Sequence, residues 1–210
     1  MEDTLMMYRW TPVALMAALA CATALDPAMA DPQVCPDETV IPDYDRSEYG
    51  RWRDEDKDCQ DTRQEILVRD STTPVVYEDE RNCRVKSGTW IGPYTGETFT
   101  DPGTVEIDHI VPLEDAHFSG AGLWERDKKR TFSNDLENLI VSGRSANRSK
   151  GSRDPAAWLP PYEGGRCDYL TKWRATKTKW ALTADPAEEA VIIYMLHICE
   201  AGGVPPLPQN

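Results

Sequence analysis

The residues with the clearest chemical potential lie in the second half of the sequence. Asp108 and His109 stand side by side in the apolar run IDHIVPL, and Asn138 and Asn147 follow downstream. Carboxylate and amide oxygens suit Mg²⁺, which keeps several waters and takes one or two protein ligands. An imidazole, with a free pKa of about 6.5, can take a proton from water at neutral pH. The pattern indicates hydrolysis in which His109 activates water beside a cation held by Asp108 and Asn147.

Each of these residues also has an ordinary structural interpretation. A single histidine in an apolar strand is commonly a packing residue, and an aspartate at a strand end commonly accepts a local hydrogen bond. Asn138 precedes a strand-like segment, where asparagine is a frequent turn residue. Asn147 lies in a basic run from Arg144 to Arg153, which would also suit a solvated helix face. The set as a whole, with its basic helix, favours the chemical interpretation.

Apolar patterning predicts the elements that would position this set. Residues 105–111 are strand-like, 138–143 form a second apolar strand, and a helix starts near Ser145 and breaks at residues 151–152. The polar region between the two strands predicts short helices at 114–118 and 124–131. The remaining predictions are helices at 62–69, 167–182 and 185–201, and strands at 75–77, 83–85 and 89–91. Such a mixture of separate helices and short strands predicts an α+β fold.

The order strand, long loop, strand, helix, together with IDHIVPL…NDLENLIVSGRSANRSKG, resembles the ββα-metal motif of HNH endonucleases. It is especially similar to secreted HNH proteins related to the C-terminal domain of GmrSD-type restriction enzymes. The motif covers residues 106–159, and the flanking YGRWRDEDKDCQDTRQEIL and YTGE extend the resemblance over most of the chain. The resemblance implies a ββα-metal core at about residues 104–159 within a nuclease domain at 46–201. The cysteine pairs that hold zinc in some HNH branches are missing, and disulfides would replace them.

The resemblance also implies roles for individual residues. His109 matches the general base, and Asp108 matches the metal-binding acid before it. Asn138 matches the middle asparagine, which organises the loop and the base, and Asn147 matches the last metal ligand. The residues expected to contact phosphate or nucleic acid are Arg144, Arg148 and Lys150. The implied reaction is cleavage of DNA or RNA with Mg²⁺ or Mn²⁺ and with little sequence preference.

A second acidic pattern, DEDKDCQDTRQE, lies ahead of the predicted first helix. Asp54, Asp56 and Asp58 alternate and Glu65 takes the twelfth place, as in a calcium-binding EF-hand loop. The sixth place, where that loop requires glycine for a sharp turn, holds Cys59 instead. The pattern therefore predicts either a structural Ca²⁺ site or a solvated acidic turn that precedes a helix.

The two ends of the chain differ in composition from its middle. Residues 1–30 combine Arg9, an apolar run at 13–25 and Ala28-Met29-Ala30, which predicts a signal peptide cleaved near Ala30 and hence an exported protein. Translation from Met6 or Met7 would remove two acids that are unusual in such a segment. Residues 31–45 are predicted to form an arm, and residues 202–210 a disordered tail. No other segment could span a bilayer, and no obligate protein partner is evident.

Export makes disulfides the expected state of the cysteines. Lipidation at Cys21 is the alternative to simple cleavage, although Ala18 stands where leucine is usual. Four cysteines can pair in three ways, and sequence alone does not choose between them. We favour the pairs Cys59–Cys83 and Cys167–Cys199, with Cys35 left over. No C-x-x-C spacing points to a zinc knuckle.

Net charge restricts how nucleic acid could bind. The formal charge is -13 at pH 7, which repels polyanions at long range, so contact requires a local basic patch or a divalent cation. Tryptophans are expected in the core, with Trp52 the best candidate for stacking on a base. His117 and His197 are expected to be packing residues. The sequence thus predicts an exported endonuclease, and the alternative is a secreted binding module that keeps the HNH scaffold without turnover.

Overall fold

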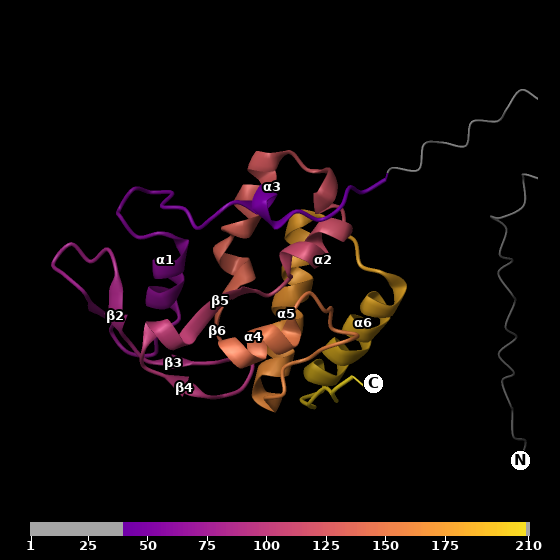
Figure 1. The fold of residues 1–210 in the computed structure, drawn as a ribbon. Helices are drawn as coiled ribbons and strands as arrows, with labels where there is room; N and C mark the ends of the chain where they lie inside the picture. The colour runs from indigo at the N-terminus through magenta and orange to yellow at the C-terminus, as the bar shows by residue number, and fades with distance from the viewer. Residues whose placement is uncertain (1–39, 209–210) are drawn as a thin grey trace, which may run out of the picture. The chain divides into compact units, whose positions relative to one another are not determined.

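The computed structural model describes residues 40–208 of the 210-residue chain. The predicted signal peptide, Cys21, Cys35 and most of the predicted arm lie outside these residues. Within them, helices combine with three small two-stranded sheets, with β1 to β4 consecutive in the first half and α4 to α6 consecutive at the end, so the predicted α+β class is confirmed (Figure 1). None of the described helices has the length and apolarity required to cross a membrane.

Most predicted elements occur where the patterning placed them. Helix α1 spans Thr62–Arg69, as predicted, and Asp61 caps it by accepting a hydrogen bond from the Gln64 backbone N–H. The other helices are α2 Leu113–Phe118, α3 Arg126–Ser133, α4 Arg144–Lys150, α5 Glu163–Trp180 and α6 Pro186–Glu200. Short 3₁₀ helices occur at η1 Arg46–Tyr49, η2 Pro102–Thr104, η3 Ala121–Leu123 and η4 Leu136–Asn138. The strands are β1 Val76–Tyr77, β2 Val85–Ser87, β3 Trp90–Ile91, β4 Thr98–Phe99, β5 Val105–His109 and β6 Leu139–Gly143.

Strands β5 and β6 form the antiparallel pair that organises the domain. Their register pairs Ile107 with Val141, Asp108 with Ile140 and His109 with Leu139. Because side chains alternate between the faces of a strand, Asp108 points to one face of the pair and His109 to the other. Helix α4 begins directly after β6 and contacts both strands. The chain therefore forms the predicted order of strand, strand and helix.

A separate hydrophobic cluster covers each face of the β5–β6 pair. On the face that carries His109, Ile107 and Val141 pack against Ile66 and Leu67 of α1 and against Trp90. The opposite face, with Ile140, joins the larger cluster, whose other members include Trp158, Tyr169, Leu170 and Trp173. In Figure 1, α1 and α4 accordingly lie on different sides of this pair.

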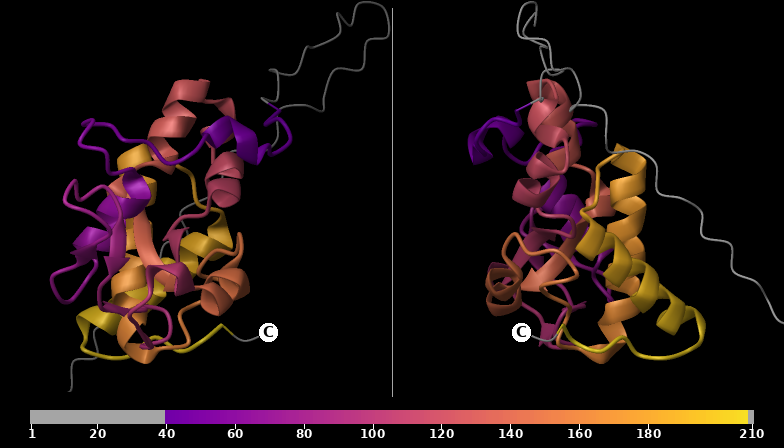
Figure 2. Two further views of the ribbon diagram at one scale, coloured as in Figure 1. Left: turned by 60° about the vertical axis from the view of Figure 1, so that its left-hand side comes forward. Right: turned by 90° about the vertical axis from the view of Figure 1, so that its right-hand side faces the viewer.

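Helices α5 and α6 pack side by side, as both views in Figure 2 also show. The Cys167–Cys199 disulfide joins them, and Cys59–Cys83 joins the acidic segment to the turn that precedes β2, so both favoured pairings are confirmed. Helix α5 begins four residues before its predicted start at 167, in a turn that contains two glycines. A Cβ at Gly165 would lie 2.0 Å from the Pro93 carbonyl oxygen, so only glycine allows this close approach.

The C-terminal segment differs from the disordered tail that composition predicts. Residues 202–208 are described, and Pro205 is buried. The Arg166 guanidinium is also buried and donates hydrogen bonds to the carbonyl oxygens of Pro160, Pro161 and Pro205. Within residues 202–208 the C-terminal segment forms no helix beyond α6, but its Pro205 carbonyl oxygen is one of the acceptors of a buried guanidinium.

Candidate active site

His109 ends strand β5 in a nearly closed environment. It is 8% exposed, its Nε2 lies 2.9 Å from the Ser133 carbonyl oxygen, and its ring stacks on Trp52 with centroids 5.5 Å apart. Because a carbonyl oxygen only accepts, Nε2 carries the hydrogen and Nδ1 carries the lone pair. Burial, together with the charges of Arg46 and Lys150, lowers the pKa of His109 to about 3, although the hydrogen bond to Ser133 acts in the opposite direction. The ring is therefore neutral at physiological pH, and the lone pair lies on Nδ1.

Asn138 fixes the backbone that follows His109. It is fully buried, its side-chain oxygen accepts a hydrogen bond from the Val111 N–H at 2.8 Å, and its Nδ2 donates to the Val111 carbonyl oxygen at 3.1 Å. Its own carbonyl oxygen accepts from the Ile110 N–H at 2.8 Å. The hydrogen bonds of Asn138 thus act on the loop that follows β5.

Asp108 faces the other side of the strand pair and is paired there. Its Oδ2 accepts a hydrogen bond from the Tyr94 hydroxyl at 2.8 Å and lies 3.0 Å from the Lys150 ammonium. Burial raises the pKa of Asp108, while the charge of Lys150 and the hydrogen bond from Tyr94 oppose that rise. Lys150 also donates to the His109 carbonyl oxygen at 2.7 Å, so this ammonium links the two neighbouring residues.

Glu106 is a further acid on the same face as Asp108, two positions earlier on β5. It accepts hydrogen bonds from Asn147 Nδ2 at 2.9 Å and from Arg144 Nε at 3.0 Å. Several contacts therefore join β5 to α4, among them Glu106 with Asn147 and Asp108 with Lys150. Glu106 and Asp108 are two residues apart on the strand, and Asn147 and Lys150 are three apart on the helix. Both spacings keep residues on one face of their element.

The donor set between β5 and α4 fits a hard divalent cation. It consists of the carboxylates of Glu106 and Asp108 and the amide oxygen of Asn147, whose nitrogen already donates to Glu106. Carboxylates and amide oxygens are preferred by Mg²⁺, Mn²⁺ and Ca²⁺. No hydrogen bond joins Asp108 to Asn147 among residues 40–208, and each has its own partner. That both bind one cation remains a prediction.

The three basic residues expected to contact phosphate have different environments. Arg148 and Arg144 are exposed, and Arg144 pairs with Glu106. Lys150 is 0% exposed and is bound to Asp108 and to the His109 carbonyl oxygen. The sequence predicts that Lys150 contacts phosphate at the surface. In the structure its ammonium is buried and pairs with the Asp108 carboxylate instead.

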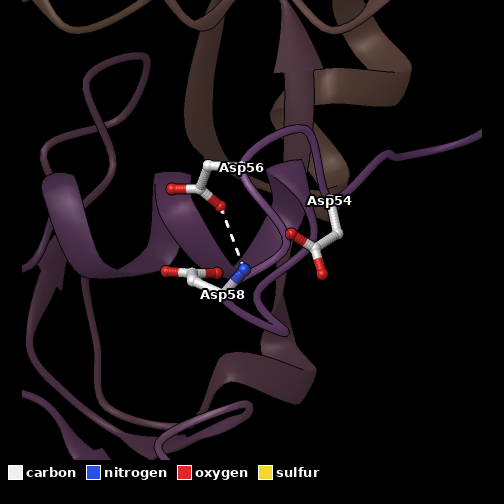
Figure 3. Close-up of side chains that lie close together, drawn as sticks. All are labelled: Asp54, Asp56 and Asp58. Atoms are coloured by element: carbon white, nitrogen blue, oxygen red, sulfur yellow. Dashed lines mark hydrogen bonds between the residues drawn. The ribbon is translucent and has the colours of Figure 1, made fainter.

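The acidic segment before α1 brings three carboxylates together. Asp54, Asp56 and Asp58 are exposed, and each offers an oxygen within 4.8 Å of the others (Figure 3). Each also accepts a backbone N–H from within the loop, and Cys59 has the positive φ of 79° at the place where an EF-hand has glycine. Glu65 is not part of this group, but burial and the nearby aspartates raise its pKa.

Both of the other histidines are predicted to be packing residues, and the structure agrees for only one of them. His117 is fully buried, with Nδ1 3.1 Å from the Tyr49 hydroxyl and Nε2 2.8 Å from the Pro42 carbonyl oxygen, so it packs as predicted. His197 is exposed on α6, so its prediction as a packing residue is wrong. Tyr194, one helical turn earlier and on the same face as His197, is exposed as well.

Sequence reasoning did not identify three contributors to this region: Tyr94, Glu106 and Ser133. For Glu106 a signal was available, since a residue two places before Asp108 on a strand shares its face. The contributions of Tyr94 and of the Ser133 carbonyl oxygen depend on tertiary contacts with distant segments.

Comparison with known proteins shows which family this sequence resembles. The family model described as GmrSD restriction endonucleases, C-terminal domain, matches residues 61–193. A relative from Arthroderma benhamiae, described as an uncharacterized secreted protein, is 35% identical over 158 residues, which cover 74% of this chain and 76% of the relative. No solved structure matches.

Proposed function

This chain belongs to the family of the C-terminal domain of GmrSD restriction endonucleases, and on that premise we propose that it is an exported, metal-dependent endonuclease. The reaction is hydrolysis of phosphodiester bonds in DNA or RNA, on a ββα-metal core of the HNH type formed by β5, β6 and α4. The observation that carries the proposal is the fixed His109 ring at the end of β5, whose Nε2 is held by the Ser133 carbonyl oxygen while Nδ1 has no hydrogen-bond partner among residues 40–208.

His109 serves as the general base. The Ser133 carbonyl oxygen fixes its tautomer and Trp52 fixes its plane, so Nδ1 has a defined direction before substrate arrives. Asn138 supports this by bonding the loop that follows. A base so positioned takes a proton from the attacking water, a contribution of about 10²–10⁴-fold.

Asp108 and Asn147 are the residues that would hold the cation, Mg²⁺ or Mn²⁺. When bound, the cation supplies stabilisation of negative charge on the phosphoryl and departing oxygens. The charge of Lys150 opposes the rise in the pKa of Asp108 that burial causes, and Tyr94 donates a hydrogen bond to its Oδ2. Arg148, exposed on α4, supplies positive charge toward the nucleic-acid backbone.

Export follows from the predicted signal peptide at residues 1–30, and the secreted relative supports it. The two disulfides of the described domain agree with an oxidising compartment. Together these observations favour action outside the cytoplasm.

Digestion of plasmid DNA and of RNA by the purified chain tests the proposal. Wild type is expected to cut with Mg²⁺ or Mn²⁺ and not in EDTA, and His109→Ala should cut about 10²–10⁴-fold more slowly. Because the pKa of His109 is about 3, the acid limb of kcat/KM should lie well below pH 6.5. His197→Ala, at an exposed position, is the matched control. Nucleic acid that is bound but never cut would overturn the enzyme and favour the non-catalytic module.

A further inference from the structure

A cleft opens beside His109, on the face of the β5–β6 pair opposite to Asp108. Its volume is ≈ 390 Å³, at the small end of the range for ligand pockets. Gly50, with a positive φ of 75°, turns the chain between η1 and the segment that carries Arg51 and Trp52. The lining residues are Arg46, Gly50, Arg51, Trp52, Asp61 and Ser133.

Two of these lining residues also hold His109. Trp52 stacks on its imidazole with an angle of 21° between the planes, and Ser133 accepts the hydrogen bond from Nε2. The charge of Arg46 reaches the same ring, since it contributes to the lowered pKa of His109. The cleft is therefore adjacent to the proposed general base.

The charges of the cleft favour an anion. Arg46 and Arg51 are exposed, and neither guanidinium forms an ion pair with a carboxylate of residues 40–208. Asp61 is the lining carboxylate, and it is engaged in capping α1 through the Gln64 N–H. In a chain with formal charge -13, two uncompensated arginines beside an indole form a local site for a phosphate group.

We infer that this cleft binds one unstacked nucleotide of a single-stranded nucleic acid, with phosphates on Arg46 and Arg51 and the base on Trp52. The inference rests on the proposed function and adds its substrate class, single-stranded DNA or RNA. An indole stacks on any base without reading sequence, which agrees with a nuclease of low sequence preference. Bases inside a duplex are stacked on each other and cannot reach the indole without being extruded.

Fluorescence anisotropy of a labelled 12-mer of single-stranded DNA, in EDTA so that no cutting occurs, tests the inference. Arg46→Ala/Arg51→Ala should weaken binding and make the plot of log K against log salt shallower by about 1.4, since each lost phosphate contact on a single strand removes about 0.7. Trp52→Leu should weaken binding by about tenfold or more, and Trp52→Phe should retain most of it. A blunt hairpin duplex should bind more weakly to wild type than the single strand does.

The control variant removes two arginines elsewhere, Arg81→Ala/Arg174→Ala, with the same change in net charge. Thermal melting of every variant checks that the fold is intact. Equal affinity and salt dependence for wild type and the Arg46/Arg51 variant would overturn the inference, as would duplex binding that depends on Trp52 as strongly as single-strand binding does. Because the assay needs no turnover, a protein that binds through this cleft but never cuts would overturn the proposed function and leave the cleft assignment standing.

Discussion

The domain contains two groups of carboxylates that differ in how their charge is balanced. Asp108 is buried, with Lys150 and Tyr94 on its Oδ2. Asp54, Asp56 and Asp58 are exposed, and each is met by a backbone N–H rather than by an ammonium or guanidinium. The negative charge of Asp108 is thus balanced by Lys150 within the protein. The charges of the three exposed aspartates must be balanced by solvent or by a bound cation.

Because of this difference, a metal ion would have a different role at each of the two groups of carboxylates. Asp108 already has the Lys150 ammonium beside it and does not need a metal ion for folding, so a cation bound there would contribute to the proposed chemistry. Three aspartates within 4.8 Å of one another repel, so a cation there would contribute to the stability of the loop. Removal of metal should therefore affect activity through one site and stability through the other.

The largest expected effect is on the buried pair. Asp108→Ala leaves the Lys150 ammonium buried without its carboxylate, which should lower the free energy of unfolding by about 3–5 kcal/mol. Asp56→Ala, in the exposed loop, should change it by less than about 1 kcal/mol in EDTA. Urea unfolding followed by tryptophan fluorescence measures both.

The double variant Asp108→Leu/Lys150→Met separates charge from packing. It should recover most of the lost stability, because an apolar pair of similar volume replaces the ion pair. If Asp108→Ala costs no more than Asp56→Ala, the proposed contrast between the two groups is wrong.

Calcium should produce the next largest effect, and at the exposed loop. Sites of this type in extracellular proteins bind with Kd of about 10⁻⁴–10⁻³ M, so 10 mM Ca²⁺ should stabilise the fold by about 1–3 kcal/mol. Differential scanning calorimetry of wild type and Asp56→Asn, with and without Ca²⁺, measures the shift. An identical melting temperature of wild type in EDTA and in Ca²⁺ would leave the acidic loop as a solvated turn.

The smallest effect concerns Glu65, whose pKa is raised by burial and by the neighbouring aspartates. A raised pKa in the folded state means that the stability is full below the unfolded pKa of about 4.5 and declines as pH rises through the folded value. Glu65→Gln should therefore stabilise by a few tenths of a kcal/mol at pH 7 in EDTA and have no effect near pH 4. With Ca²⁺ the sign should reverse if Glu65 is a ligand, and melting curves at the two pH values detect this.

The sequence predicted the parts of the fold that depend on local patterning. β5 and β6 were found because runs such as LIVSG are too apolar to lie at the surface, and α6 because Asp185 caps it. The sequence does not predict strand β4, because its two residues are too few to show the alternation of apolar and polar side chains that marks a strand. The first turn of α5 was missed because glycines disfavour helix, whereas Gly165 is required there by its contact with the Pro93 carbonyl oxygen.

The candidate site was predictable in its residue types and less so in its contacts. His109 lies at the end of β5, and Asn138 binds the loop that follows it; the role of His109 as general base stays a proposal. The sequence does not predict the burial of Lys150, because a lysine on a short basic helix is expected to be exposed. Its contact with Asp108 is known only from the tertiary structure. The pairing of Asp108 with Tyr94 likewise links segments whose proximity only the tertiary structure defines.

Arg166 has a practical consequence for anyone who handles this protein. Its guanidinium depends on the carbonyl oxygen of Pro205, 2.8 Å away, as well as on Pro160 and Pro161. Trimming the chain at the glycines that follow α6 would strip a buried cation of one acceptor and loosen the start of α5. An affinity tag is therefore better appended beyond the final prolines than substituted for them.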